Sequence, residues 1–76
     1  MSPYLPILKA RDMIRILRDL GFISTGYKGS HERFAHPDGR STEVPHHGGT
    51  DIGRRLLQDI LREIKMSPQE FRKLLS

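Results

Sequence analysis

The segment that decides the fold runs from Phe22 to Pro45 and reads FISTGYKGSHERFAHPDGRSTEVP. It contains three short runs with the composition of β-strands, bounded by turn-forming residues. We expect strands at Phe22–Tyr27, His31–His36 and Ser41–Pro45. Lys28-Gly29-Ser30 is a tight connection, and Pro37-Asp38-Gly39 has proline and glycine in the order that a tight turn favours. Short connections between consecutive strands predict an antiparallel meander.

Helical patterns lie on both sides of this meander. Apolar residues recur at helical spacing over residues 9–20, with Gly21 where a helix ends in a left-handed residue. A second apolar stripe predicts a helix near residues 53–65. Ser67-Pro68-Gln69-Glu70 is a capping box with proline at the first helical position, which predicts a short third helix. Residues 1–8 predict an extended lead-in, and residues 46–51 predict a glycine-containing loop.

This order of elements predicts an α+β fold, a two-layer sandwich of helices on one face of a sheet. With 76 residues, we expect residues 1–76 to form a single domain. Helices on one face leave the other face open to solvent or ligand. Because side chains alternate along a strand, an inward Phe34 sends His31, Arg33 and Ala35 to the open face.

The same alternation makes two further predictions. With Val44 inward, Glu43, Pro45 and His47 tend outward. Glu32 and His36 are polar residues on the inward side of their strand. We therefore expect both at the edges of the strand rather than beneath the helices.

Composition restricts the class of protein. The chain has no cysteine and no run of apolar residues near the ~20 that cross a bilayer, so we expect a soluble, cytoplasmic protein without a membrane partner. Its net charge is +4. A small basic domain favours a polyanionic partner, most often nucleic acid, although ordinary solvated surface and an acidic protein partner remain open.

Four histidines raise the possibility of a metal site, but their spacing argues against one. Alternation places His31 and His36 on opposite faces, and there is no HExxH motif or cysteine pair, so we predict no metal. A serine hydrolase is also disfavoured, because Ser30 is adjacent to His31 and no GxSxG elbow exists.

Acid–base work by histidine fits better. RNA carries its own nucleophile, the 2′-hydroxyl, so a ribonuclease needs only to move protons and stabilise charge on the phosphate. An exposed imidazole at His31 suits proton transfer near neutral pH. Lys28, Arg33 and the amides of Gly29 and Ser30 are then candidate phosphate contacts. From spacing alone, a surface histidine beside a turn is the alternative reading.

A set of motifs favours the catalytic interpretation of His31. In chain order they are LPIL, LGF at the end of the first helix, KGSHERF, HPDGR, TEVPHHGG and SPQEF. Over about residues 5–75 the chain resembles the HicA toxins of bacterial and archaeal type II toxin–antitoxin systems, also called HicA mRNA interferases.

The resemblance implies a fold, an activity and a partner. The fold is α-β-β-β-α, similar to double-stranded RNA-binding domains, here with a short extra C-terminal helix. The activity is an endoribonuclease that cleaves mRNA and blocks translation without a metal or cofactor, and the partner is a HicB-like antitoxin. The family's GSH histidine, which is catalytic, corresponds to His31, and the histidine of its VPxHG segment corresponds to His47. His47 is thus a candidate second acid or phosphate contact, whereas we expect His36 to pack or hydrogen-bond.

Two alternatives remain at this point. A non-catalytic double-stranded RNA-binding module would bind RNA without cutting it. An inhibitory protein that binds another protein would be indifferent to RNA.

Overall fold

The computed structural model describes residues 5–45 and 49–75. Its elements follow the predicted order, with two additional short strands. They are β1 (Leu8–Lys9), α1 (Ala10–Asp19), β2 (Ile23–Lys28), β3 (His31–Ala35), β4 (Ser41–Pro45), β5 (Asp51–Ile52), α2 (Arg54–Glu63) and α3 (Pro68–Leu75). The prediction of an α+β fold with a three-stranded antiparallel sheet and three helices is confirmed, and this arrangement is consistent with the double-stranded RNA-binding-domain-like fold that the resemblance implies.

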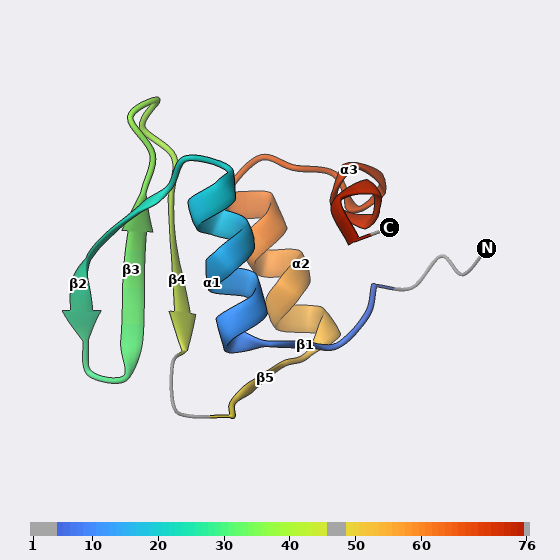
Figure 1. Ribbon diagram of the computed structural model, residues 1–76, viewed down its shortest axis with the longest axis horizontal. Coiled ribbons are helices and arrows are strands. Elements are labelled where there is room, and N and C mark those ends of the chain that lie inside the picture. Colours follow the sequence, from blue (N-terminus) through green and yellow to red (C-terminus); the bar gives the residue numbers. More distant parts are fainter. Residues whose placement is uncertain (1–4, 46–48, 76) are drawn as a thin grey trace.

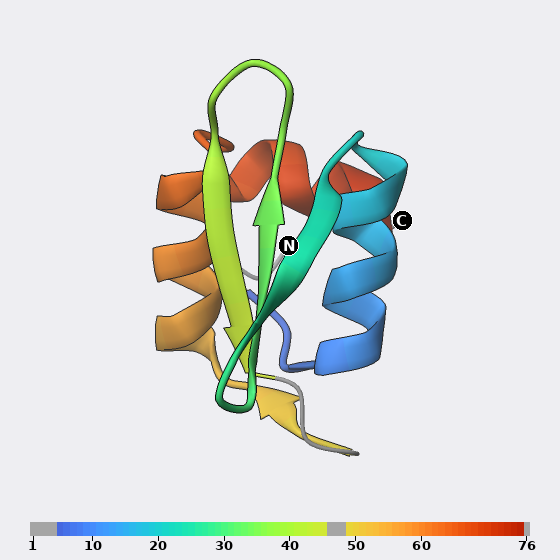
Figure 2. The ribbon, with the colours of Figure 1, turned by 90° about the vertical axis from the view of Figure 1, so that its left-hand side faces the viewer.

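The main sheet has the strand order β2-β3-β4, with both pairs antiparallel. In Figure 1 the sheet lies at the left, α1 and α2 lie side by side to its right, and α3 lies beyond them at the far right. Turned by 90°, the sheet lies in front of the helices and its outer face is uncovered (Figure 2). Phe34 and Val44 point inward and are buried in the core with Leu17, Leu57 and Phe71. The predicted two-layer arrangement, with one face of the sheet open, is therefore present.

A β-bulge in β2 changes the face to which its last residues point. Ser24 lies opposite Phe34 on β3, but the register then shifts, and Gly26 lies opposite Arg33. Gly26 has a φ of 122°, a region that side-chain-bearing residues rarely adopt. The extra residue reverses the alternation, because two residues of β2 oppose one of β3. Lys28 consequently lies opposite His31 on the open face, and Tyr27 lies opposite Glu32 on the inner face.

Strands β1 and β5 form a second, two-stranded sheet that the sequence did not predict. Leu8 lies opposite Ile52, and the Lys9 ammonium lies 2.7 Å from an Asp51 carboxylate oxygen. Two residues are too few for any alternation to be visible in the sequence. This pairing joins the segment after β4 to the start of α1 (Figure 1).

Helices α1 and α2 end in the same way. After α1, the Gly21 amide donates to the Arg18 carbonyl and the Phe22 amide donates to the Leu17 carbonyl, which is the Schellman arrangement. Gly21 has a φ of 97°, which confirms its predicted role. After α2 the same two bonds form around Lys65, a non-glycine residue with a φ of 57°. The predicted helices over residues 9–20 and 53–65 thus agree with α1 and α2 within two residues at each end.

The predicted capping box before α3 is also present. The Glu70 amide donates to the Ser67 hydroxyl at 3.1 Å, and the Ser67 amide donates to the Glu70 carboxylate at 3.0 Å. This bond from the Ser67 backbone lowers the pKa of Glu70 below its usual value.

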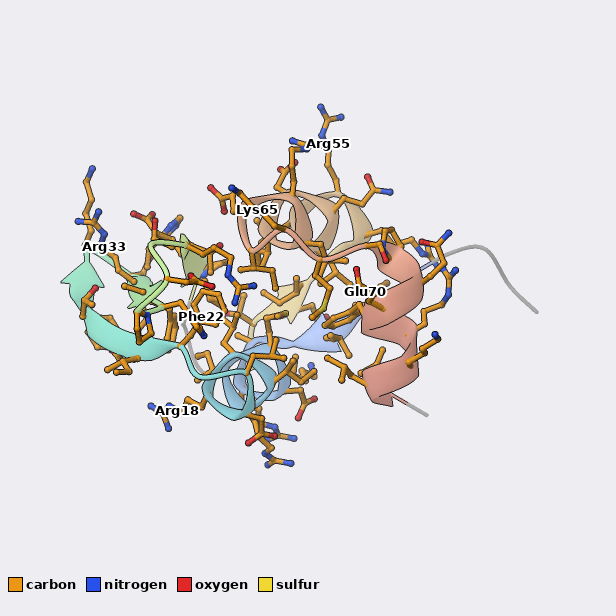
Figure 3. All side chains as sticks on the ribbon, turned by 90° about the horizontal axis from the view of Figure 1, so that it is seen from above. Arg18, Phe22, Arg33, Arg55, Lys65 and Glu70 are labelled. Carbon is orange, nitrogen blue, oxygen red and sulfur yellow. The ribbon has the colours of Figure 1, made fainter. Side chains whose placement is uncertain are left out.

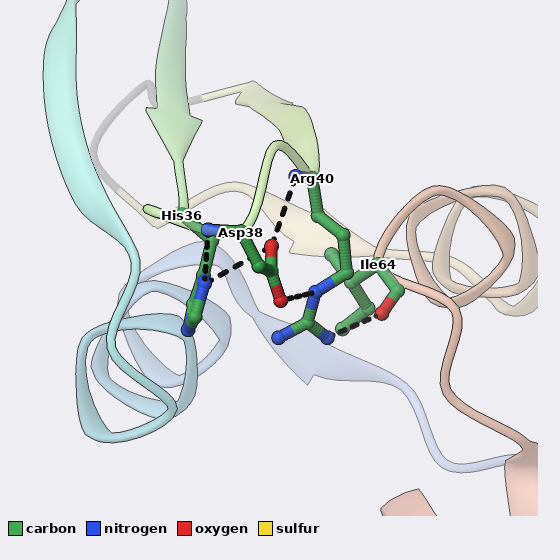
Figure 4. A network of polar contacts seen from close by, with 4 residues as sticks. All are labelled: His36, Asp38, Arg40 and Ile64. Carbon is green, nitrogen blue, oxygen red and sulfur yellow. Dashed lines mark hydrogen bonds and ion pairs between the residues drawn. The ribbon is translucent and has the colours of Figure 1, made fainter.

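His36 belongs to a network at the turn between β3 and β4. Its Nδ1 accepts from the Asp38 amide at 3.1 Å, and its ring packs edge-on against Phe22 at 5.1 Å. The Arg40 guanidinium donates to Asp38 at 2.8 Å and to the Ile64 carbonyl at 2.7 Å (Figure 4). These contacts tie the turn to the end of α2. They agree with the expectation that His36 packs and hydrogen-bonds at a strand end.

Glu32 is a correction to the prediction. We expected it at an edge of its strand, but it is buried, with only 4% of its surface exposed. The reason is that β3 is the central strand of the sheet, so side chains on its inner face are flanked by those of β2 on one side and β4 on the other. The Tyr27 hydroxyl on β2 donates to the Glu32 carboxylate, and residues of α1 line the same region. This hydrogen bond offsets part of the cost of burying a carboxylate.

Candidate functional site

The candidate site is built on the hairpin that joins β2 to β3. Lys28 and His31 are directly paired, so only Gly29 and Ser30 form the loop. Gly29 has a φ of 60°, and a two-residue hairpin favours glycine at its first position for this reason. The loop thereby places Lys28 and His31 directly opposite each other next to the turn, with both side chains on the open face.

A carboxylate lies beside the imidazole. Nδ1 of His31 is 3.5 Å from Oε1 of Glu43, and Nε of Arg33 is 3.3 Å from Oε2 of the same residue. Arg33 and Glu43 are paired across β3 and β4, which explains why they meet. Half of the His31 side chain is exposed (51%), so it remains accessible to a large substrate. Figure 3 shows Arg33 extending from the sheet on the side away from the helices.

This arrangement has a chemical consequence. A carboxylate next to Nδ1 favours the tautomer in which Nδ1 carries the proton, and it leaves Nε2 free to accept one. Glu43 also reduces the positive charge that Arg33 presents to a phosphate. Lys28, which is paired with His31, has no ion-pair partner among the described residues, so its charge is not neutralised in the way that the charge of Arg33 is.

Glu43 was missing from the site residues predicted from the sequence. Alternation had placed it on the open face, but it lies twelve residues after His31 and no motif connects the two. Only the register of β3 against β4, which puts His31 opposite Pro45 and Arg33 opposite Glu43, brings it to the imidazole.

The open face next to the site contains a shallow groove of about 270 Å³. It is lined by residues of all three strands, among them Thr25, Arg33, Ser41 and Glu43. Arg33 and Glu43 therefore lie at an open groove, which also reaches Glu63 of α2, and His31 is half exposed beside Glu43 rather than in an enclosed pocket. Such a surface suits a polymer better than a small molecule.

Two other histidine predictions have different outcomes. His36 is at the opposite end of β3 from His31, roughly 16 Å along the strand. It does not join the site. The prediction for His47 lies outside the described residues and stays a prediction; the described part of β4 ends at Pro45, opposite His31. Within residues 5–45 and 49–75, no group of three or more His, Asp or Glu side chains gathers in a way that would hold a metal ion.

A comparison with protein families agrees with the motifs. The family model described as "HicA toxin of bacterial toxin-antitoxin" matches residues 10–66. The match spans most of the chain, from the start of α1 to just before α3. The protein is therefore the toxin component of a toxin–antitoxin system, and it has an antitoxin partner.

The chain belongs to the HicA toxin family. A comparison with curated proteins found no significant match. Among the described residues, no helix is both long enough and apolar enough to span a membrane.

Proposed function

We propose that this toxin is an endoribonuclease, an mRNA interferase that cleaves mRNA by attack of the 2′-hydroxyl with His31 as the catalytic residue. The observation that carries the proposal is the exposed His31 imidazole, which lies beside Glu43 through Nδ1 and beside Lys28 across the hairpin. No metal or cofactor is required, since RNA supplies the nucleophile.

The reaction follows from the positions of these groups. Nε2 of His31 accepts the proton of the 2′-hydroxyl as its oxygen attacks the adjacent phosphorus. The bond from phosphorus to the 5′-oxygen breaks, and that oxygen takes up a proton from a second acid, the role we propose for His47. The products are a 2′,3′-cyclic phosphate and a free 5′-hydroxyl.

The charge that develops on the phosphate needs stabilisation. Lys28 provides a full positive charge, Arg33 provides a charge shared with Glu43, and the Gly29 and Ser30 amides are further donors. We assign these four residues to phosphate binding. A glycine at the turn leaves its backbone open to the substrate, because the space where a Cβ would stand is empty.

The partner follows from the same proposal. We propose that the antitoxin is a HicB-like protein and that mRNA and this antitoxin compete for the open face. We also propose that residues 1–76 act as one HicA-like domain.

The decisive experiment is substitution of His31 by alanine. Because the side chain is exposed and outside the core, His31→Ala should keep the circular dichroism spectrum and melting temperature of the wild type. The rate of mRNA cleavage should fall by roughly 10²–10⁴-fold or more, because general acid–base catalysis contributes a factor in this range. Gln58→Ala, an exposed change on α2 outside the open face, is the control and should cleave normally.

The products provide a second readout of the same experiment. A single 2′-deoxy sugar at the cut site should block cleavage, and the wild-type product should end in a 2′,3′-cyclic phosphate. Comparable cleavage by His31→Ala would remove His31 as the catalytic residue. Intact binding of RNA with no cleavage by the wild type would instead favour the non-catalytic RNA-binding module.

A further inference from the structure

Helix α1 has a row of arginines on its exposed side. Arg11, Arg15 and Arg18 are spaced by four and three residues, so they lie on one face of the helix. All three are exposed, whereas the opposite face buries Met13 and Leu17. The row extends for about 10 Å along the helix axis.

These arginines line a groove between α1 and the edge strand β2. The groove has a volume of about 410 Å³. Its lining includes Arg11, Arg15, Arg18, Asp19, Tyr27 and Glu32. Three cations therefore face two carboxylates, and one of these, Glu32, is buried and already accepts a hydrogen bond from Tyr27. The accessible charge in the groove is predominantly positive.

Tyr27 is the aromatic residue of the groove. Its hydroxyl is held by Glu32, yet 60% of the residue is exposed, so much of the ring is open to a ligand. Partial desolvation and the Glu32 carboxylate raise the pKa of Tyr27. An aromatic ring beside arginines is the usual platform for a nucleic acid base next to its phosphates.

The groove adjoins the candidate site across the edge of β2. Tyr27 precedes Lys28, which lies opposite His31, and because successive side chains alternate, Tyr27 points to the inner face and Lys28 to the open face. A strand of RNA leaving His31 past Lys28 crosses the edge of β2 and reaches Tyr27 next. In Figure 2, α1 lies behind the sheet at the edge that β2 forms.

We propose that the groove formed by Arg11, Arg15, Arg18 and Tyr27 holds the single-stranded RNA that flanks the cleavage point. One base stacks on Tyr27 and the arginines bind successive phosphates. This inference rests on the proposed ribonuclease function and adds a second substrate-binding surface to it.

A protein partner fits this groove less well. Tyrosine and arginine are common at protein interfaces, but the fully buried core of such an interface is predominantly apolar. The aliphatic residue in the lining, Ile14, is only 6% exposed. A single-stranded polyanion with stacking bases matches the accessible groups directly.

The test is binding of a fluorescein-labelled, single-stranded oligonucleotide with 2′-O-methyl sugars, which lacks the nucleophile and is not cut. For Arg15→Gln/Arg18→Gln, the slope of log affinity against log salt should flatten by about 1.4, and affinity near 0.1 M salt should fall by roughly 10- to 30-fold. Arg55→Gln is the matched control. Arg55 is an exposed helix residue that points to the opposite side of the molecule from Arg18 (Figure 3), and its substitution should leave the slope unchanged.

Tyr27 is tested separately. Tyr27→Ala should weaken binding by roughly tenfold without changing the salt slope, because stacking involves no charge. Tyr27→Phe keeps the ring and loses the hydroxyl that binds Glu32, so it should bind like the wild type.

Each outcome separates this inference from the proposed function. If the double arginine variant has the salt slope of the wild type and cleaves mRNA normally, the groove does not bind RNA. That result overturns this inference and leaves the proposed ribonuclease function standing. If the variant has the salt slope of the wild type but no longer binds the antitoxin, the groove is a contact for the protein partner. That result also overturns the inference. Failure of the wild type to bind or cut RNA at all overturns both.

Discussion

Glu43 contacts two of the proposed site residues, and the expected effects on them are opposite. Its Oε1 lies 3.5 Å from Nδ1 of His31, where it favours one tautomer of the proposed base, and its Oε2 lies 3.3 Å from Nε of Arg33, where it neutralises part of the charge proposed to bind phosphate. Exposed ion pairs of this kind contribute little to folding stability, about 0–1 kcal/mol. The value of Glu43 therefore lies in the geometry of the site rather than in holding the sheet together.

This dual effect makes a prediction that a purely structural role would not make. In Glu43→Gln we expect kcat for RNA cleavage to fall by about tenfold, less than loss of the base itself would cost. Binding of uncleavable RNA should become tighter, because Arg33 is released from its carboxylate.

The measurements are single-turnover cleavage and fluorescence anisotropy, with Asp59→Asn as control. Asp59 is an acid on α2 that pairs with Arg62 at 3.4 Å, away from the sheet. A parallel fall in cleavage and binding in Glu43→Gln would contradict the assigned role, since it would indicate general damage to the face.

At the scale of elements, the helix ends differ in how well their residues suit the same geometry. Gly21 adopts a positive φ after α1 without steric cost, whereas Lys65 adopts one after α2 with a Cβ in the way. The hydrogen bonds that close both helices are equivalent. The end of α2 therefore carries a backbone strain at Lys65 that the end of α1 does not carry at Gly21.

Replacing this lysine should relieve the strain. We expect Lys65→Gly to increase the free energy of unfolding by about 0.5–1 kcal/mol, since the penalty of roughly 1–2 kcal/mol for a left-handed residue exceeds the entropy cost of glycine. Thermal and urea unfolding measure the change.

Two variants serve as controls. Lys65→Ala retains the Cβ and should not stabilise, and Arg62→Gly, inside α2, should destabilise by about 1 kcal/mol. A destabilised Lys65→Gly would show that the positive φ is not strained in this protein.

At the scale of the whole molecule, the face of the sheet that carries His31 is not covered by the described helices. Figure 2 shows no described helix in front of the sheet, because α1 and α2 both lie on its inner side. Helix α3 is held on the far side of them by Phe71, which is fully buried. None of these elements covers His31, so inhibition by an antitoxin requires contact from outside or interference at a distance.

We expect the antitoxin to cover the site directly. The positive charge of Lys28 beside His31 in the hairpin favours an acidic contact surface on the partner. In the complex, the amides of residues 28–33 should exchange hydrogen more slowly than in the free toxin. The two exposed arginines at the start of α2, Arg54 and Arg55, are a second candidate contact, although Nε of Arg54 already donates to the Leu5 carbonyl at 2.8 Å.

Hydrogen exchange measured by mass spectrometry distinguishes the possibilities. Amides in α3 serve as an internal reference, because that helix is remote from the sheet (Figure 1). Unchanged exchange at residues 28–33 in the inhibited complex would exclude occlusion of the site and would point to an indirect mechanism.

Local patterns in the sequence determined most of the fold. The alternation in His31–Ala35 and Ser41–Pro45, the turn at Pro37-Asp38-Gly39, the end of α1 at Gly21 and the capping box at Ser67 each depend on residues within a few positions of one another. Such features are set by steric and hydrogen-bonding preferences of the local chain, so they are readable without knowing the rest of the molecule. The same applies to the exposure of His31, which follows from its position relative to Phe34.

Only the tertiary structure decided how these elements meet. Simple alternation from Ser24 would send Lys28 to the inner face, and the bulge at Gly26 places it opposite His31 instead. The contact of Glu43 with His31, the burial of Glu32 under α1 and the pairing of β1 with β5 all join residues distant in sequence. Strand register depends on the packing of the whole sheet against its helices, and a shift of one residue moves every later side chain to the other face. For that reason the sequence determined which residues are available for the site, and the packed sheet decided which of them act together.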